Sequence, residues 1–318
     1  MYENGTAVVF GGSGFVGRYV VQCLAQAGYM VRVANRRPDQ GALLRSLGDV
    51  GQIAPFYASV LDDYSVASVM RDADVAINLV GVLSSTRGQR LEAVNVDGAG
   101  RVARFAAEAG VGRYVHMSAL GASATAPSAY GRSRAAGEDA VRRHRPDAAI
   151  VRPSLIFGRE DHFFNRFAAL ARYLPVMPVY EPDTRIQPVY VGDVAQVITR
   201  LATQDGYGGR VWPLGGPDVM TMCQIARFVL AETRRSKPVL VVPRWLARLQ
   251  AGVLERLPGA MLTRDQLLML SRDNVMPGPE SGFEPFGITP RSVASCVPAY
   301  LDRFRPGGER AEMAVDEL

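Results

Sequence analysis

Three glycines at a regular spacing are the first residues in this sequence whose types and positions suggest a chemical task. Gly11, Gly14 and Gly17 lie between a short β-branched run and an apolar periodic segment. Glycines allow a tight turn, a close approach of the backbone to a pyrophosphate, and close packing of a helix on a strand. A helix that begins at such a turn presents unpaired N–H groups to an anion. The pattern predicts a strand over residues 6–10, a phosphate-binding turn, and a helix over 19–27.

A pair of arginines follows at the place where a dinucleotide site reads the adenosine ribose. A second strand is expected over 30–34, and the next three residues are Asn35, Arg36 and Arg37. An NAD-preferring site has a carboxylate here, whereas guanidinium groups form bidentate, charge-assisted hydrogen bonds with a phosphate. Arg18 could add another cation. The sequence therefore predicts NADPH as the cofactor, against the alternative that the arginines are a solvated pair in a turn.

Strands and helices must alternate along the chain to position these residues, and the hydrophobic pattern indicates that they do. Such alternation is typical of a doubly wound parallel sheet of Rossmann type with right-handed crossovers. We expect this α/β fold to be followed by a smaller, mostly helical C-terminal lobe. Further strands are expected over 52–58, 74–80, 113–118, 148–152 and 210–214, and helices over 62–71, 92–109, 135–144, 161–173, 189–202 and 222–234.

The carboxyl ends of the strands are where such sheets bind ligands, and they bring several segments to one edge. We expect the cofactor to contact the glycine turn and the residues that directly follow the strands. These are Gly11, Ser13, Gly14, Phe15, Val16, Gly17 and Arg18; Asn35, Arg36 and Arg37; Ser59 and Val60; Val80, Gly81 and Val82; Ser118; and Pro153, Ser154, Leu155 and Ile156.

Composition excludes several other classes of protein. The 318 residues are 48% hydrophobic and 21% charged, as in ordinary globular domains and unlike disordered or fibrous chains. No apolar stretch reaches the roughly 18 residues of a membrane-spanning helix, and the early first strand leaves no room for a targeting peptide. Cys23, Cys223 and Cys296 have no disulfide or zinc-site spacing. We expect a soluble chain in a reducing compartment that binds no metal and, lacking a basic stripe with aromatics, no nucleic acid.

Several sequence blocks resemble the extended short-chain dehydrogenase/reductase superfamily. They are GGSGFVG at the first turn, INLVG after the fourth strand, NVDGA with Asn95, VHMSA with Ser118, YGRSR with Tyr130, and RPSLIFG at 152–158. A narrower resemblance, to the dinucleotide-binding accessory subunits of respiratory complex I, is carried by LGDVGQI, IFGREDHFFNRFA, IQPVYVGDVA and LTRDQL. The resemblance implies that Asn95, Ser118, Tyr130 and Arg134 also contact the cofactor, and that subunits of complex I are the partners.

The superfamily's catalytic motif is a tyrosine followed four positions later by a lysine, with a serine that orients a carbonyl. Tyr130 and Ser118 match, but Arg134 replaces the lysine, and the only lysine among the 36 Lys and Arg residues is Lys237. Arginine keeps the charge, but its planar, bulky guanidinium does not substitute conservatively for a compact ammonium. Ser59 likewise replaces an aspartate that contacts the adenine in relatives. We expect binding to survive better than proton transfer; if the chain is active, Tyr130, Ser118 and Arg134 would be its catalytic residues.

The expected domain organisation is a Rossmann domain followed by an interleaved lobe. The Rossmann domain is assigned to 1–155, with 186–216 returning to it, the C-terminal lobe to 156–185 and 217–306, and a mobile tail to 307–318. Phe163, Phe164 and Phe167 are expected to be core residues in preference to a substrate pocket.

A second surface feature is the amphipathic helix expected over 244–257. Leu246, Leu249, Val253 and Leu257 would share one side of it, with Trp245 and Arg248 at the flank. Such a helix either lies on a membrane surface or a partner, or packs on its own lobe.

Taken with the resemblance, these features favour an accessory subunit of respiratory complex I that holds NADPH as a structural ligand and stabilises the junction of the peripheral and membrane arms. The expected location is the cytoplasmic side of a bacterial inner membrane. Two alternatives remain open. One is an active NADPH-dependent reductase or isomerase of a quinone-pathway or isoprenoid substrate, and the other is a binding protein that senses NADP(H).

Overall fold

The computed structural model describes residues 4–85, 89–255, 262–278 and 282–307. The chain divides into two compact units. The first unit consists of Met1–Pro153, Val191–Leu214 and Gly282–Ile288, and the second of Ser154–Tyr190, Gly215–Ser281 and Thr289–Leu318. Apart from Gly307, the expected tail lies outside the described residues.

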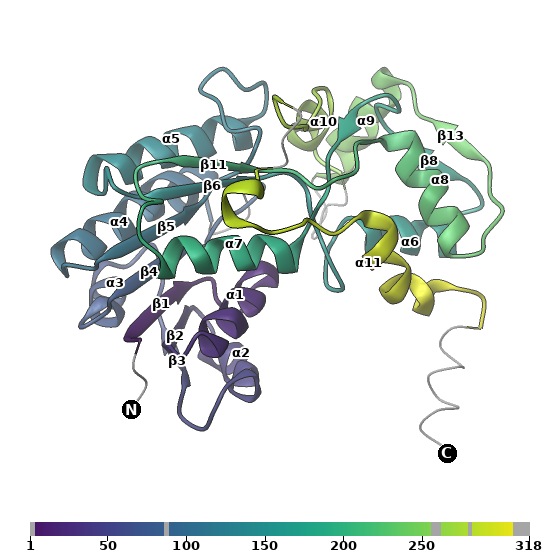
Figure 1. The fold of residues 1–318 in the computed structure, drawn as a ribbon. Helices are drawn as coiled ribbons and strands as arrows, with labels where there is room; N and C mark the ends of the chain where they lie inside the picture. Colours follow the sequence, from purple (N-terminus) through teal and green to yellow (C-terminus); the bar gives the residue numbers. More distant parts are fainter. Residues whose placement is uncertain (1–3, 86–88, 256–261, 279–281, 308–318) are drawn as a thin grey trace, which may run out of the picture. The chain divides into compact units, whose positions relative to one another are not determined.

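A seven-stranded parallel sheet forms the centre of the first unit (Figure 1). Its order is β11-β6-β5-β4-β1-β2-β3, so the chain reverses its direction of winding between β1 and β4. This reversal is the point at which doubly wound sheets bind ligands. The predicted α/β fold is confirmed. The strands are β1 (Thr6–Phe10), β2 (Met30–Asn35), β3 (Ile53–Tyr57), β4 (Val75–Asn78), β5 (Arg113–Met117), β6 (Ala149–Pro153) and β11 (Val211–Leu214).

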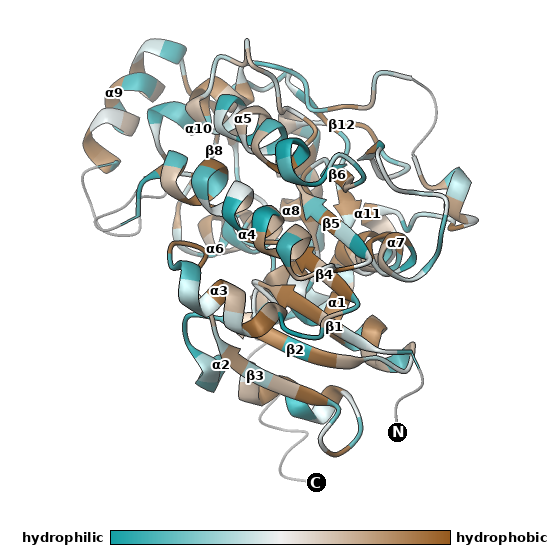
Figure 2. Cartoon of the chain, turned by 90° about the vertical axis from the view of Figure 1, so that its left-hand side faces the viewer, coloured by the Kyte–Doolittle hydropathy of each residue, from teal (hydrophilic) through white to brown (hydrophobic). Residues whose placement is uncertain are grey.

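Helices cover both faces of this sheet. On one face α1 packs beside α7, and on the other α4 packs between α3 and α5. Figure 2 shows hydrophobic residues concentrated in the central strands and hydrophilic residues on the outer sides of α4 and α5. The helices are α1 (Phe15–Gln26), α2 (Pro38–Ala42), α3 (Asp63–Met70), α4 (Ala99–Glu108), α5 (Ala129–His144) and α7 (Val191–Thr203).

Some predicted helix bounds were wrong, and at α5 a capping side chain explains the difference. Helix α5 begins at Ala129 and not at 135, because the Ser128 hydroxyl accepts a hydrogen bond from the Gly131 N–H at 3.1 Å. The helix expected over 92–109 is instead a π-helix, Ala93–Gly98, followed by α4. The earlier start of α5 places both residues of the tyrosine motif on its first two turns.

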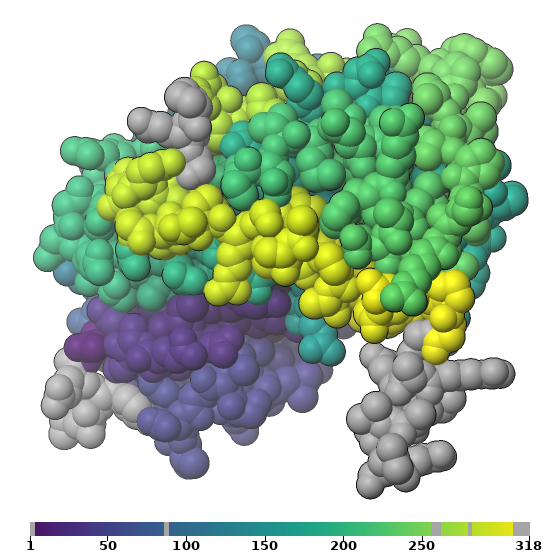
Figure 3. All heavy atoms as spheres, turned by 45° about the vertical axis from the view of Figure 1, so that its right-hand side comes forward, coloured from purple at the N-terminus to yellow at the C-terminus, as the bar shows by residue number. Residues whose placement is uncertain are grey.

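A segment from late in the chain, Gly282–Ile288, completes the first unit. The Phe286 ring lies 5.0 Å from the rings of both Tyr207 and Trp212. Figure 3 shows this yellow segment against the green chain of α7 and β11. Gly282 has a φ of +83°, and a Cβ there would lie 2.0 Å from the Pro213 carbonyl oxygen. This return is absent from the sequence-based division because a single anchoring phenylalanine produces no periodic signal.

The second unit has a separate core, in which Phe157, Phe164 and Met177 are fully buried. Phe163 and Phe167 pack against this core, as expected. Helix α6 begins three residues later than predicted because the Asp161 carboxylate accepts hydrogen bonds from the Phe163 N–H and the Tyr300 hydroxyl. The helices are α6 (Phe164–Tyr173), α8 (Met222–Glu232), α9 (Arg244–Leu254), α10 (Arg264–Leu270) and α11 (Val293–Leu301).

Short strands join these helices. They are β7 (Ile156–Phe157), β8 (Met177–Val179), β9 (Arg185–Ile186), β10 (Val189–Tyr190), β12 (Met220–Thr221) and β13 (Val239–Val241). Because β10 occupies Val189 and Tyr190, the helix expected from 189 begins at Val191. Within the described ranges, no helix combines the length and apolar character needed to cross a membrane, and no group of His, Cys, Asp or Glu side chains could hold a metal ion.

Candidate functional site

The glycine turn between β1 and α1 has the geometry of a phosphate cradle. Gly11 has a φ of +75°, and a Cβ on Gly17 would lie 2.2 Å from the Gly11 carbonyl oxygen, so the turn excludes a side chain at that position. Gly14 is the N-cap of α1 and provides no side-chain cap for the first N–H groups. These N–H groups and the helix dipole therefore remain available to an anion.

The residues expected to contact the adenosine ribose lie at the end of β2: Asn35 is its last residue, and Arg36 and Arg37 follow it. Asn35 is buried, and both polar atoms of its side-chain amide lack a hydrogen-bond partner among the described residues. Arg36 and Arg37 are exposed, and no described residue forms a hydrogen bond or ion pair with either guanidinium. A ribose hydroxyl and a 2′-phosphate would supply the partners that these groups lack. These groups could therefore hold a ribose that carries a phosphate.

The loop after β3 is held by its own side chains. The Ser59 N–H donates to the Ser65 hydroxyl at 3.1 Å, and the Ser59 hydroxyl accepts from the Leu61 N–H at 3.3 Å. Arg101 donates to the Val60 carbonyl oxygen at 2.8 Å. Ser59 and Val60 therefore stand in a fixed conformation at the carboxyl edge of the sheet.

Asn95 holds the loop after β4 that contains Val80, Gly81 and Val82. Its side-chain oxygen accepts from the Val82 N–H, and its amide nitrogen donates to the Val82 carbonyl oxygen, both at 2.9 Å. The same nitrogen donates to the Ser133 hydroxyl at 3.0 Å. Both amide hydrogens of Asn95 are thus engaged within the protein. Asn95 therefore positions the loop after β4 through the backbone of Val82. Its direct contact with the cofactor remains a prediction.

Arg134 is packed against the tyrosine of the motif. Its Nε donates to the Tyr130 hydroxyl oxygen at 3.1 Å, and its Nη1 donates to the Met117 carbonyl oxygen at 3.1 Å. Arg134 is only 5% exposed. A Cβ on Gly81 would lie 2.0 Å from the Arg134 Nη2, so the guanidinium fills the space over that glycine. The arginine is therefore held in a fixed position beside the β4 loop.

Ser118 donates its hydroxyl hydrogen to the buried carboxylate of Glu138. Its Oγ lies 2.5 Å from the Oε1 of Glu138, which is fully buried. Arg152 donates to both oxygens of Glu138 at 2.7 Å, and this hydrogen bonding raises the pKa of Arg152. Arg142 adds a third ionic contact at 3.1 Å. Because Ser118 has one hydroxyl hydrogen and Glu138 accepts it, that hydrogen is not available to polarise a substrate carbonyl.

Neither Glu138 nor Arg152 was predicted from the sequence. The available signal is spacing, since Glu138 follows Arg134 by one helical turn and so shares its face of α5. Nearby on β5, burial lowers the pKa of His116 to about 3, with a smaller contribution from the positive charges of Arg134 and Arg142. His116 is therefore neutral at physiological pH.

The last predicted contacts divide between the two units. Pro153 ends β6 in the first unit, and its carbonyl oxygen accepts from the Leu120 N–H at 2.9 Å. Ser154, Leu155 and Ile156 belong to the second unit. There the Ser154 hydroxyl donates to the Asn274 carbonyl oxygen at 3.1 Å, and Ile156 enters β7.

The chain is similar in sequence to known proteins. A family model described as the NAD dependent epimerase/dehydratase family matches residues 7–215. The chain is 33% identical to "NADH dehydrogenase [ubiquinone] 1 alpha subcomplex subunit 9, mitochondrial" of Arabidopsis thaliana, over 98% of this chain and 81% of that protein. It is 35% identical to a "Ceramide reductase" of Caulobacter vibrioides over 60% of this chain and 59% of that protein.

Among solved structures, the fold is similar to that of an NADPH-dependent quinone oxidoreductase of Escherichia coli complexed with NADPH. The TM-score is 0.75 at 19% identity, and the match covers 93% of this chain and 99% of that one. This likeness concerns the fold alone.

Proposed function

Because the chain belongs to the NAD dependent epimerase/dehydratase family, we propose that it holds NADPH as a structural ligand and serves as an accessory subunit of a respiratory NADH:quinone oxidoreductase. The observation that best supports a cofactor held without turnover is the hydrogen bonding of Tyr130, Arg134 and Ser118 within the protein. The similarity to the Arabidopsis subunit over nearly the whole chain supports the choice of assembly.

The choice of NADPH over NADH rests on the corner formed by Asn35, Arg36 and Arg37. The strand β2 ends at Asn35, and the next two residues are arginines and not a carboxylate. Among the described residues neither exposed guanidinium group has a partner that a phosphate would have to displace. When bound, NADPH supplies a hydride to an acceptor, but its binding also stabilises the protein by mass action because only the folded chain forms the site. The second effect is sufficient for a structural ligand.

The arrangement near Tyr130 supports binding without turnover. The Arg134 guanidinium is fixed by hydrogen bonds to Tyr130 and to the Met117 carbonyl, and Ser118 donates to Glu138. Moving either side chain toward a substrate would break a buried hydrogen bond that involves a charged group, at a cost of about 1.5–3 kcal/mol each. The residues of the motif therefore hold the first turns of α5 against β5.

Turnover assays test this proposal most simply. We expect the unaltered protein to show no NADPH oxidation above background with a panel of quinones, aldehydes and ketones, measured at 340 nm as roughly less than 0.01 per second. Arg134→Lys is expected to change NADPH affinity by less than about tenfold, since one cation replaces another. Measurable turnover by the unaltered protein that disappears in Tyr130→Phe would contradict the proposal.

A second candidate function is an active NADPH-dependent reductase or isomerase. The similarity to the Caulobacter ceramide reductase favours it, although that match covers 60% of this chain. In this reading Tyr130 is the proton donor, and the substrate is a lipid-like carbonyl compound, such as one of a quinone or isoprenoid pathway. The same assays decide between the two candidates.

The second unit carries an exposed apolar surface suited to a partner or to lipid. Its strip consists of Trp245, Leu249 and Val253, which recur at four-residue spacing on α9 and are each at least 50% exposed. The opposite side of α9 is buried through Ala247 and Ala251, so this strip faces solvent. The expected apolar side is thus only partly realised: Leu246 is half-buried, and Leu257 lies outside the described residues. We propose that this strip contacts a membrane surface beside the enzyme complex.

Vesicle flotation tests the strip. The unaltered protein is expected to float with vesicles of an anionic phospholipid. The double variant Trp245→Glu with Leu249→Glu is expected to reduce the bound fraction about tenfold, because two charges replace apolar area that the lipid would bury. The matched control is the pair Tyr57→Glu and Tyr64→Glu, which alters exposed aromatic residues of the first unit. If both double variants lost vesicle binding equally, or if Trp245→Glu with Leu249→Glu lost none, the strip would have no role in membrane binding.

A further inference from the structure

A groove of about 380 Å³ lies on the first unit between α4 and α5, outside the proposed cofactor site. Its floor is formed by Gly100 and Ala140, where the helices come so close that a Cβ on Gly100 would lie 3.2 Å from the Ala140 Cβ. The volume falls within the range of sites that hold small molecules. The small floor residues leave the charged side chains on both walls to define the site.

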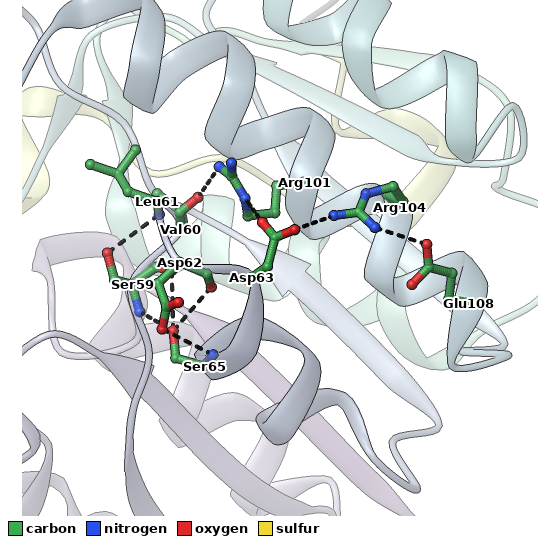
Figure 4. A network of polar contacts seen from close by, with 9 residues as sticks. All are labelled: Ser59, Val60, Leu61, Asp62, Asp63, Ser65, Arg101, Arg104 and Glu108. Carbon is green, nitrogen blue, oxygen red and sulfur yellow. Dashed lines mark hydrogen bonds and ion pairs between the residues drawn. The ribbon is translucent and has the colours of Figure 1, made fainter.

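One wall is an organised pair of arginines (Figure 4). Asp63, at the start of α3, accepts hydrogen bonds from the Arg101 Nε and, at 2.8 Å, from the Arg104 Nη2. The hydrogen bond from Arg101 is the main reason that the pKa of Asp63 lies below its ordinary value. One carboxylate thus orients two guanidinium groups in the groove. Arg104 donates one hydrogen from Nη2 to Asp63 and one from Nη1 to Glu108, so each of these nitrogens keeps one further hydrogen for a ligand.

The other wall is the last turn of α5. Arg143 is exposed, and its Nε donates to the Asp139 carbonyl oxygen at 3.3 Å. In the part of the chain that the structure describes, nothing engages its two terminal amino groups. His144 lines the same wall. Arginine presents a planar fork that matches phosphate oxygens, and charge-assisted pairs of this kind are stronger than neutral ones.

A carboxylate stands opposite these cations. Asp97 lines the groove from the π-helix and is exposed, with no hydrogen-bond partner among the described residues. It would repel a bare anion but would accept hydrogen bonds from hydroxyl groups of a ligand. The unengaged amino groups of Arg143, the remaining N–H hydrogens of Arg104 and the carboxylate of Asp97 together suit a molecule that carries both a phosphate and hydroxyl groups.

We propose that this groove binds a small phosphate monoester of a polyol, with its phosphate on Arg104 and Arg143 and a hydroxyl group on Asp97. The proposal adds a second ligand site to the first unit, and the existence of this site does not rest on the proposal that the chain holds NADPH. Inorganic phosphate shares the phosphate chemistry but lacks the hydroxyl groups, so the two sources can be told apart.

Arg101 connects this groove to the predicted adenine loop. Its Nη1 donates to the Val60 carbonyl oxygen at 2.8 Å while its Nε binds Asp63. A phosphate that draws Arg101 toward the groove would weaken the bond to Val60. The ester and NADPH are then expected to bind antagonistically, with equal and reciprocal effects of about fivefold. This coupling, unlike the site itself, rests on the proposed function.

Titration calorimetry of the whole chain tests the site directly. The probes are ribose 5-phosphate, inorganic phosphate and ribose. We expect ribose 5-phosphate to bind most tightly, Arg143→Gln to weaken it about tenfold or more, and Asp97→Asn to weaken ribose 5-phosphate while improving inorganic phosphate. The control Arg71→Gln, an exposed arginine of the same unit, should have no effect.

Several results would overturn this inference. Absence of ribose 5-phosphate binding at millimolar concentration by a folded protein would do so, as would an equal effect of Arg143→Gln and Arg71→Gln. Binding of inorganic phosphate that equals that of the ester in both the unaltered chain and Asp97→Asn would remove the polyol part. A normal ester titration with no effect on NADPH would refute only the coupling, and failure of NADPH to bind would leave the ester titration valid.

Discussion

Replacing Arg36 and Arg37 together with glutamine will weaken NADPH binding by roughly 100-fold and leave NADH binding within about twofold. The reason is that both guanidinium groups are exposed and unengaged among the described residues beside the Asn35 amide, where only a 2′-phosphate would form charge-assisted hydrogen bonds with them. NADH lacks this phosphate. The measurement is a fluorescence titration of each nucleotide with the purified, nucleotide-free chain.

Arg45→Gln is the matched control for this pair, because Arg45 is an exposed arginine of the same region. It is expected to leave both affinities unchanged at fixed ionic strength. An equal loss of NADPH and NADH affinity in the double variant would show that the arginines do not read the 2′-phosphate. Tighter binding of NADH than of NADPH by the unaltered chain would also refute the choice of cofactor.

The largest expected effect on stability comes from Glu138. Glu138→Ala is expected to lower the free energy of unfolding of the first unit by about 3–5 kcal/mol. The substitution would leave Arg152 and Arg142 without their shared buried carboxylate and Ser118 without its acceptor. The measurement is urea unfolding followed by the fluorescence of Trp212, a first-unit residue, in a Trp245→Phe background.

Asp139→Ala provides the comparison for Glu138. Asp139 is adjacent on α5, but its side chain is 71% exposed and it contacts Arg142 only at 3.4 Å. Exposed ion pairs contribute at most about 1 kcal/mol, so this variant should unfold almost as the unaltered chain does. If Glu138→Ala cost no more than Asp139→Ala, the buried network would not stabilise the unit, and the argument that Glu138 holds Ser118 would fail.

Much of the fold was predictable because local patterns determine it. The glycine turn, the β-branched runs and the periodic helices each carry their own signal, and together they specify the doubly wound sheet. Helix ends were less predictable, since they depend on single side chains such as Ser128, which caps α5, and Asp161, which accepts a hydrogen bond from the Phe163 N–H just before α6. The return of Gly282–Ile288 could not be predicted, because its stability comes from Phe286 packing on residues about 75 positions earlier.

The candidate site shows the same division. The glycines and the arginine pair could be identified as candidate binding residues from their spacing along the chain. Their role in binding NADPH remains a prediction. The contact of Ser118 with Glu138 depends on how the face of α5 meets β5 and β6, which no local spacing reveals. Asn95 is similar, because its amide meets Val82 only when the π-helix packs beside the β4 loop.

The proposed function is tested most directly in gently solubilised membranes of the cells that encode the protein. The two observations needed are which nucleotide the protein has bound and which complex it migrates with. The measurement is native electrophoresis of these membranes, followed by denaturation of the band and identification of the released nucleotide. We expect the chain to co-migrate with the subunits and activity of NADH:quinone oxidoreductase and to release NADPH or NADP⁺. A chain that migrates free of that complex, or that releases only NAD(H) or no nucleotide, would contradict the proposed function.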